Sequence, residues 1–233
     1  SCGIKLYGSK NLVRCNVVGN SSAGQACLNL MAISGDCNAI VKNRFDGDTG
    51  YGFILGGVFD STGIRDARAS NNTIRDNNFT VTGVGGWSPG KTIFGGDPNL
   101  VFNNIINDTS NKVQLGRLNW YFVDKVAVEN PKWGNVVHGP FYGGNFWLNY
   151  TGTDSNNDLL GDTGVPHMGF DYHPLIKAKC GDVNCDGMIT GADVTKVFNA
   201  MYGGSICSHW AADVNCDHII TGADATKVFN AMY

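Results

Sequence analysis

Near the C-terminus, oxygen-bearing side chains follow a spacing that suits a metal loop. Asp182, Asn184, Asp186, Thr190 and Asp193 stand at positions 1, 3, 5, 9 and 12 of a 12-residue segment, with a glycine at position 6. Alternate residues of such a tight loop point inward, and the backbone carbonyl at position 7 adds one more oxygen. Hard oxygen ligands in this order are typical of Ca²⁺. The sequence therefore predicts a calcium loop, with the position 7 carbonyl supplied by Met188.

A second copy of this loop begins 31 residues later. Its expected ligands are Asp213, Asn215, Asp217, the carbonyl of Ile219, Thr221 and Asp224. His218 replaces the glycine, where the backbone tends to be left-handed, so we expect weaker binding. A third oxygen-rich stretch is either another calcium turn or a solvated polar loop. Its candidate ligands are Asp154, Asn156, Asp158, Leu160 and Asp162. Calcium is the expected cofactor, at two sites near the C-terminus, with a third in the linker if that stretch is a calcium turn.

Each C-terminal loop runs into the same 13-residue segment, residues 190–202 and 221–233, with Ala225 for Val194 as the one change. The apolar positions of each segment fall on one stripe of a helix, which is typical of a buried face. Val197, Phe198 and Met201 belong to this stripe. The duplicated loop and helix resemble type I dockerins, modules that fold around calcium and bind cohesins. The resemblance implies a cohesin partner, but loop positions 10 and 11 lack the hydroxyl pair of many cellulosomal dockerins.

The eight cysteines form two groups of four, which indicates an oxidising, extracellular setting. They are Cys2, Cys15, Cys27, Cys37, Cys180, Cys185, Cys207 and Cys216. Pairing within each C-terminal half would join Cys180 to Cys185 and Cys207 to Cys216. The other four have three possible connectivities, which the sequence leaves open. Glycosylation motifs point to the same setting and occur at Asn20, Asn71, Asn78, Asn107 and Asn149.

Four N-terminal segments share a short pattern in which an asparagine lies between apolar residues. The aligned asparagines are Asn16, Asn43, Asn77 and Asn104, at spacings of 27, 34 and 27 residues, with an apparent insertion over 58–69. Short strands recurring once per period predict a parallel β-helix, in which stacked asparagine amides bond to their copies. The alternative is an antiparallel sandwich with asparagine-rich turns.

The segment Ser70 to Phe79 resembles the repeat of the NosD-like right-handed β-helix family. That family includes copper-protein maturation factors, carbohydrate-processing proteins and many archaeal surface proteins. Residues 143–154, 161–163 and 171–175 resemble the segment that closes many of those β-helices. We therefore expect a mainly β chain: a right-handed parallel β-helix over 1–150, a closing segment and linker over 151–179, and a small helical calcium-binding module over 180–233.

Composition excludes several classes of protein. The formal charge of −3 gives no basic surface for nucleic acid. Gly and Asn, 32 and 26 residues, disfavour a helical bundle or a Rossmann-type enzyme. We find no apolar run long enough for membrane insertion. The β-helix pattern starts at Gly3 with no room for a cap, so we expect either a longer chain or a second subunit to cover the first coil.

No spacing in the chain forces two carboxylates together as a hydrolase requires. We therefore expect a secreted or cell-surface structural protein without enzymatic activity, which assembles with itself head to tail into a filament or array, or docks to a cohesin-bearing scaffold. The competing hypothesis is a carbohydrate-active enzyme or sugar-binding module that its dockerin attaches to a cellulosome-like complex. In that case the tryptophans would bind glycan, including glycan of the cell surface.

Overall fold

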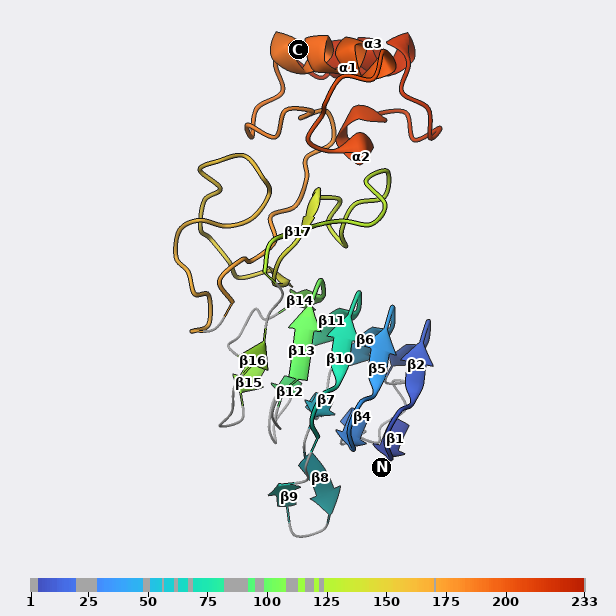
Figure 1. The fold of residues 1–233 in the computed structure, drawn as a ribbon, viewed down its shortest axis with the longest axis vertical. Helices are drawn as coiled ribbons and strands as arrows, with labels where there is room; N and C mark the ends of the chain where they lie inside the picture. The colour runs from blue at the N-terminus through green and yellow to red at the C-terminus, as the bar shows by residue number, and fades with distance from the viewer. Residues whose placement is uncertain are drawn as a thin grey trace. The chain divides into compact units, whose positions relative to one another are not determined.

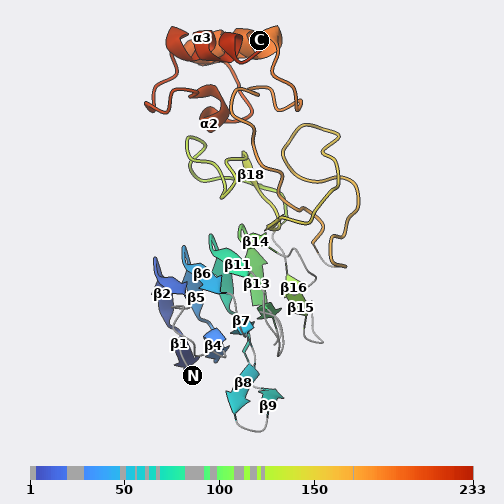
Figure 2. The ribbon, with the colours of Figure 1, turned by 180° about the vertical axis from the view of Figure 1, so that it is seen from behind.

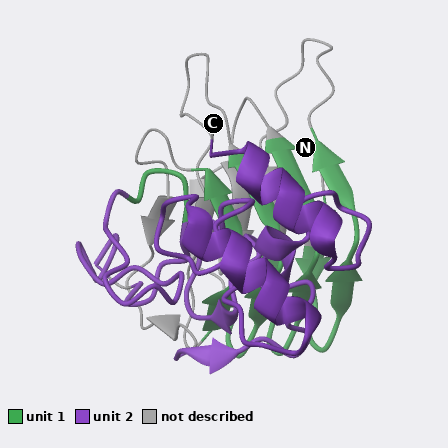
Figure 3. Cartoon of the chain, turned by 90° about the horizontal axis from the view of Figure 1, so that it is seen from above, with its two compact units in different colours: residues 1–123, 147–150 green, residues 124–146, 151–233 purple. Residues whose placement is uncertain are grey.

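The computed structural model describes residues 4–19, 29–47, 51–55, 57–60, 63–66, 69–81, 92–94, 99–107, 113–115, 120–121, 124–169 and 171–232. The chain divides into two compact units (Figure 3). The first unit comprises residues 1–123 and 147–150, and the second comprises residues 124–146 and 151–233. Residues 124–146 thus belong with the C-terminal part, whereas we expected the first domain to reach residue 150.

Three five-stranded parallel sheets form the first unit, and each turn of the chain contributes one strand to each sheet (Figure 1). In spatial order, one sheet contains β1 (Ile4–Tyr7), β4 (Asn29–Ser34), β7 (Tyr51–Leu55), β12 (Thr92–Phe94) and β15 (Val113–Leu115). The next contains β16 (Trp120–Tyr121), β13 (Asn99–Phe102), β10 (Thr73–Arg75), β5 (Ala39–Val41) and β2 (Leu12–Arg14). The third contains β19 (Phe146–Trp147), β14 (Ile105–Asn107), β11 (Asn78–Val81), β6 (Arg44–Gly47) and β3 (Val17–Gly19).

This topology confirms a mainly β fold with parallel strands of the β-helix type, and it excludes the antiparallel sandwich for these strands. The register also follows the sequence repeat, because Ile40 pairs with Val13 on one side and with Ile74 on the other. The expected insertion contains an antiparallel hairpin of β8 (Gly57–Asp60) and β9 (Gly63–Asp66).

Apolar side chains at equivalent repeat positions fill the interior of the β-helix. Phe45 and Phe79 have no exposed surface, and their rings stack in parallel with centroids 5.0 Å apart. They belong to neighbouring strands β6 and β11 and are direct partners in the register (Figure 2). Because each coil repeats the inward position of the previous one, the core is continuous along the stack.

Two ladders of asparagines run along the stack. The expected ladder is present: the side-chain amide of Asn43 donates to Asn77 Oδ1, and that of Asn77 donates to Asn104 Oδ1, each at 3.0 Å. The second ladder, which we did not expect, has the same spacing of 27, 34 and 27 residues and comprises Asn11, Asn38, Asn72 and Asn99. Both ladders supply hydrogen bonds to backbone groups that the turns between strands leave without a strand partner.

The second unit contains the short antiparallel pair β17 (Val126–Ala127) and β18 (Phe141–Tyr142), and three helices. The helices are α1 (Gly191–Met201), α2 (His209–Ala212) and α3 (Gly222–Asn230). Helices α1 and α3 pack side by side (Figure 3), over a core of Val183, Val197, Ala212, Ala225 and Val228. Among the described residues, no helix has the length and apolar character needed to cross a membrane.

The two parts of the closing segment meet inside this unit. The backbone N–H groups of Asn145 and His173 donate to the buried carboxylate of Asp171, at 2.8 and 3.1 Å. A Cβ atom on Gly144 would lie 1.8 Å from Asp171 Oδ1, so glycine is needed there. Two of the three sequence segments that resembled a β-helix closing motif are therefore held together by one buried carboxylate.

Candidate functional site

In the first predicted metal loop, carboxylates accept backbone hydrogen bonds. Asp186 and Gly187 donate their N–H groups to Asp182, at 3.1 and 2.8 Å. Val183 donates to Asp193 Oδ1 at 2.8 Å, and both of these carboxylates are buried. Burial raises the pKa of Asp182, and the nearby carboxylates of Asp193 and Asp186 raise it further, while the hydrogen bonds from the backbone oppose the shift. The loop is thus folded around its own acidic side chains.

The last two predicted ligands of the loop also form the N-terminal cap of α1. Thr190 is the N-cap residue, and its hydroxyl accepts a hydrogen bond from the N–H of Ala192 at 3.2 Å. The carboxylate of Asp193 accepts the N–H of Thr190 at 2.8 Å, which completes a capping box. Capping explains the threonine and aspartate at this spacing without a metal.

The second loop repeats this arrangement. Asp217 and His218 donate their N–H groups to Asp213, at 3.1 and 2.8 Å, and Thr221 and Asp224 form the capping box of α3. His218 has the left-handed conformation expected at this position, with φ of 68° against 85° for Gly187. The substitution therefore keeps the backbone path and adds a side chain where the first copy has none.

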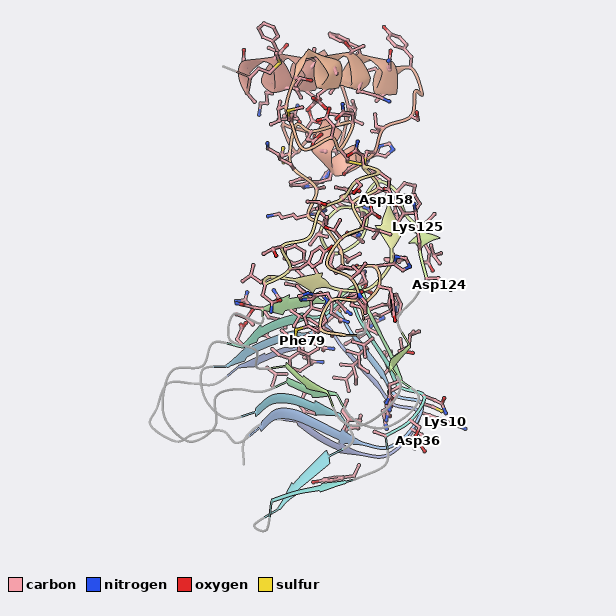
Figure 4. All side chains as sticks on the ribbon, turned by 90° about the vertical axis from the view of Figure 1, so that its left-hand side faces the viewer. Lys10, Asp36, Phe79, Asp124, Lys125 and Asp158 are labelled. Atoms are coloured by element: carbon pink, nitrogen blue, oxygen red, sulfur yellow. A yellow bond between two sulfur atoms is a disulfide. The ribbon has the colours of Figure 1, made fainter. Side chains whose placement is uncertain are left out.

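The third oxygen-rich stretch folds in the same way. Asp158 and Leu159 donate their N–H groups to Asp154, at 3.2 and 2.7 Å, and Leu159 takes the glycine position with φ of 62°. Asp158 pairs with Lys125, whose Nζ lies 2.5 Å from Asp158 Oδ2 (Figure 4). A lysine already neutralises the carboxylate that would be the third ligand here, so the loop is folded by its own hydrogen bonds and an ion pair.

The outer faces of α1 and α3 leave large apolar side chains in solvent. Phe198 is 47% exposed and its copy Phe229 is 49% exposed, while Tyr202 after α1 is 87% exposed. Val197 and its copy Val228 are fully buried. The predicted core stripe is therefore correct at the valines and wrong at the phenylalanines, because two short helices that pack side by side bury only a narrow strip of each helix.

A cavity of about 500 Å³ lies within the second unit. Trp133, Trp210, His138, His209 and His218 are among the residues that line it. Its walls contain two aromatic contacts: the ring of His138 stacks on Trp210 with centroids 4.4 Å apart, and His218 meets Trp133 edge to face at 5.0 Å.

The sequence analysis did not group these cavity residues, although a signal was present. His218, His209 and Trp210 are all departures of the second copy from the first: the second loop has a histidine for glycine, and four extra residues stand between its preceding cysteine and its first aspartate. The extra residues form α2. Comparing the two copies for their differences would have singled out three of the residues that line the cavity.

A disulfide joins Cys185 to Cys207, with Cα atoms 6.0 Å apart. The expected pairing within each half is therefore wrong. The N–H of Cys207 donates to the carbonyl of Val183 at 3.1 Å, so the segment before the second loop runs against the first loop. In the structure the sulfurs of Cys180 and Cys216 are not bonded to each other, and burial, followed by the proximity of Cys216, raises the pKa of the Cys180 thiol.

The N-terminal cysteines and the glycosylation motifs are partly described. Cys15 and Cys37 are exposed free thiols in different turns, after β2 and before β5 respectively, so they do not pair with each other. Asn71 is exposed, whereas Asn78, Asn107 and Asn149 are partly buried. Cys2, Cys27 and Asn20 lie outside the described residues.

The parallel coils and their closing segment define a β-helix protein whose C-terminal residues form a loop-and-helix unit. Residues 1–152 match the sequence model of a family described as "Periplasmic copper-binding protein (NosD)". The match covers more than half of the chain, so this protein belongs to the NosD family. The prediction that this protein lies outside the cytoplasm is confirmed, because the family is of a periplasmic or extracellular type. No curated protein and no solved structure matches the chain.

The family description raises the question of a copper site. Within the described part of residues 1–152, Cys15, Cys37 and His138 are the cysteine and histidine side chains. The two thiols occupy different turns, and the His138 ring stacks on Trp210. Copper sites need two or more soft or imidazole ligands on one ion. The described residues do not fit such a site.

The prediction of calcium as the cofactor is wrong. The family that the chain belongs to is described as binding copper, and no group of three or more histidine, cysteine, aspartate or glutamate side chains in the described part of the chain is placed to hold a metal ion. The oxygen spacing that suggested calcium is accounted for by hydrogen bonds to the loop backbone and by the helix caps. The comparisons also give no support to a dockerin module, a cohesin partner or a filament.

Proposed function

We propose that this protein is a non-enzymatic assembly protein of the periplasm or cell surface, which associates with further copies of itself through the outer face of α1 and α3. The observation that carries the proposal is the exposure of Phe198 and its copy Phe229, close to half of each side chain. Large apolar side chains exposed at repeated positions mark protein interaction surfaces more often than scattered ones do.

The internal duplication favours a partner that is itself repeated. Two nearly identical helices present the same exposed phenylalanine, so the face offers two equivalent contacts. Tyr202 extends this apolar face beyond the end of α1. A symmetric face of this kind is complementary to the same face of a second copy, which is the geometry of a two-fold interface.

Light scattering and negative-stain electron microscopy of the purified chain test the proposal. We expect wild-type protein to form dimers, and the double variant F198D/F229D to be monomeric with an unchanged circular dichroism spectrum. The matched control is Met188→Asp, which removes a 61% exposed apolar side chain outside the helices and should leave assembly intact. A monomeric wild type at all concentrations would overturn self-association, and a different protein partner such as a cohesin would then be sought.

The cavity favours sugar binding as a second candidate function. Trp133 is 54% exposed and lines the cavity together with Trp210 and the polar side chains of Lys132 and Asp213. Indole rings beside hydrogen-bonding groups suit a pyranose, which has an apolar face and a hydroxylated edge, and the volume is in the ordinary range for small ligands.

Tryptophan fluorescence titrated with cello- and chito-oligosaccharides tests sugar binding. We expect a saturable change that Trp133→Ala abolishes and that Met188→Asp retains. No change with any of these sugars would remove this candidate and leave the assembly proposal untouched.

A further inference from the structure

We propose that Cys180 and Cys216 form a second disulfide, related to Cys185–Cys207 by the internal duplication of the C-terminal unit. The observed bridge joins a cysteine inside the first loop to the cysteine that precedes the second loop. The counterpart of Cys185 is Cys216, since each is the fourth residue of an Asp-Val-Asn-Cys-Asp segment. The remaining cysteine before the first loop is Cys180. Exchanging the two copies therefore converts the observed bridge into Cys180–Cys216.

The two loop cysteines have the same backbone conformation. Cys185 and Cys216 both have φ of 61°, and the hydrogen bonds around them match, since the residue after each donates its N–H to the first aspartate of the loop at 3.1 Å. The direction in which the Cα–Cβ bond leaves the backbone is fixed by these dihedrals. The backbone around Cys216 therefore matches the backbone around Cys185, although Cys216 is exposed and Cys185 is buried.

The backbone also brings the segment of Cys180 to the second loop. Gly181 donates its N–H to the carbonyl of Ala211 at 2.9 Å, and Ala211 lies two residues before Asp213, the first residue of the second loop. Cys216 donates to the carbonyl of Asp213 at 3.3 Å. Two hydrogen bonds and a short stretch of α2 therefore connect the neighbour of Cys180 to Cys216.

The surroundings of Cys180 support this placement. The charged or titratable groups that act on its thiol are Cys216, Asp213, Lys227 and Asp224, which all belong to the second copy. Cys180 therefore faces the second copy, although it precedes the first loop in the sequence.

The oxidation needs a thiol-disulfide oxidant, such as a small-molecule disulfide or an oxidoreductase of the periplasm. The thiolate of one cysteine attacks the oxidant and releases one thiol, and the second cysteine then displaces the other thiol from the mixed disulfide. One sulfur–sulfur bond breaks in the oxidant and one forms in the protein, while two electrons and two protons leave with the oxidant. An extracytoplasmic location is where such bonds form and persist.

Two bridges of this kind would tie each loop to the segment that enters the other loop. The cluster of buried residues under α1 and α3 has only five members, and small cores of this kind are typical of domains that need covalent staples. The duplicated helices would then be held in a fixed mutual orientation even where the noncovalent core is weak.

Peptide mapping of the full chain under non-reducing conditions tests the bridge, after purification in the presence of oxidised glutathione. Trypsin is unsuitable alone, because it leaves Cys180 with Cys185 on residues 180–196 and Cys207 with Cys216 on residues 197–227. Cleavage before aspartate separates all four cysteines. We expect residues 171–181 linked to residues 213–216, and residues 182–185 linked to residues 193–212.

Free Cys180 and Cys216, alkylated by iodoacetamide in the folded oxidised protein, would overturn the proposal, as would a link between residues 171–181 and 182–185. The variant Cys180→Ser provides an independent readout. We expect it to expose one additional reactive thiol, at Cys216, while Cys185 and Cys207 stay protected. The control Cys15→Ser, at an exposed cysteine of the β-helix, should leave Cys216 unreactive.

Discussion

The side-chain amide of Asn77 donates a hydrogen bond to Asn104 Oδ1 at 3.0 Å, and Asn77 Oδ1 in turn accepts the amide of Asn43. Asn77 also donates to the backbone carbonyls of Ile40 and Arg75, at 2.8 and 2.9 Å. One buried side chain therefore links three successive coils of the β-helix. The ladder satisfies backbone groups in the turns, where no strand partner exists.

Replacing Asn77 by leucine should destabilise the β-helix strongly. The asparagine is 1% exposed, and its loss leaves several buried donors and acceptors without partners. Because each such group costs about 1–3 kcal/mol, we expect the free energy of unfolding to fall by at least about 2 kcal/mol. Urea denaturation followed by circular dichroism measures the change.

The matched control is Asn16→Leu, at the equivalent position of the first described coil. Asn16 is exposed, and Asn43 Oδ1 keeps the hydrogen bond from the Asn16 backbone N–H at 3.0 Å. We expect a loss below about 1 kcal/mol there. Equal losses in the free energy of unfolding at both positions would show that the contribution of a ladder asparagine to stability does not depend on its burial.

Much of the β-helix could be predicted from the sequence, because each coil repeats the same apolar positions around an asparagine. Val13, Ile40 and Ile74 are separated by 27 and 34 residues in the sequence, and the same residues are paired with each other in neighbouring strands. The ladder through Asn11 and Asn38 was missed because these residues lie before β2 and β5, outside the repeated segment that surrounds Asn16 and Asn43.

The C-terminal unit shows where sequence reasoning stops. Periodicity placed Val197 and Phe198 on one stripe, but only contacts between α1 and α3 decide which part of a stripe is covered, and Phe198 remains half exposed. The oxygen spacing predicted the shape of the loops correctly. It gave the wrong cofactor, because carboxylates that fold a loop by accepting N–H groups have the same spacing as carboxylates that bind a cation.

Gly144→Ala should prevent the closing segment from packing. A methyl group at this position would overlap the buried carboxylate of Asp171, which is fixed by hydrogen bonds from Asn145 and His173. Overpacking of a rigid interior costs about 1–3 kcal/mol, so we expect the melting temperature to fall by several degrees. Differential scanning fluorimetry measures it.

Gly191→Ala is the control for that substitution, since a Cβ atom on Gly191 meets open space at the start of α1. It should be neutral or slightly stabilising, because alanine has the higher helix propensity. If Gly144→Ala left the melting temperature unchanged, Asp171 would be able to move away from the added methyl group without loss of stability.

Asp193→Ala should unfold the first loop and the start of α1 together. The carboxylate is fully buried and accepts the N–H groups of Val183, Asn184 and Thr190. We expect a loss of about 2–4 kcal/mol in the free energy of unfolding, because buried donors are left without an acceptor. Amide hydrogen exchange should localise the loss to residues 182–193.

Asp186→Ala is the comparison within the same loop, because Asp186 is exposed and accepts the N–H of Met188 at its edge. Its loss should be below about 1 kcal/mol, since water can replace the carboxylate. If Asp186→Ala were as damaging as Asp193→Ala, the buried hydrogen bonds would not be what holds this loop.

The ion pair between Lys125 and Asp158 should make a small, salt-sensitive contribution. Lys125 Nζ lies 2.5 Å from the carboxylate and 4.3 Å from the centre of the Phe141 ring, but the lysine side chain is 41% exposed. Solvent screening therefore limits the pair, and Lys125→Met should cost no more than about 1 kcal/mol in low salt. A double-mutant cycle with Asp158→Asn isolates the interaction, and its coupling energy should shrink as ionic strength rises from 0.02 to about 0.5 M.

The control is Lys177→Met, at another exposed lysine of the same unit. A coupling energy that does not respond to salt would show that Asp158 is held by its hydrogen bond to Leu160, at 2.8 Å, and that the lysine contributes only packing on Phe141.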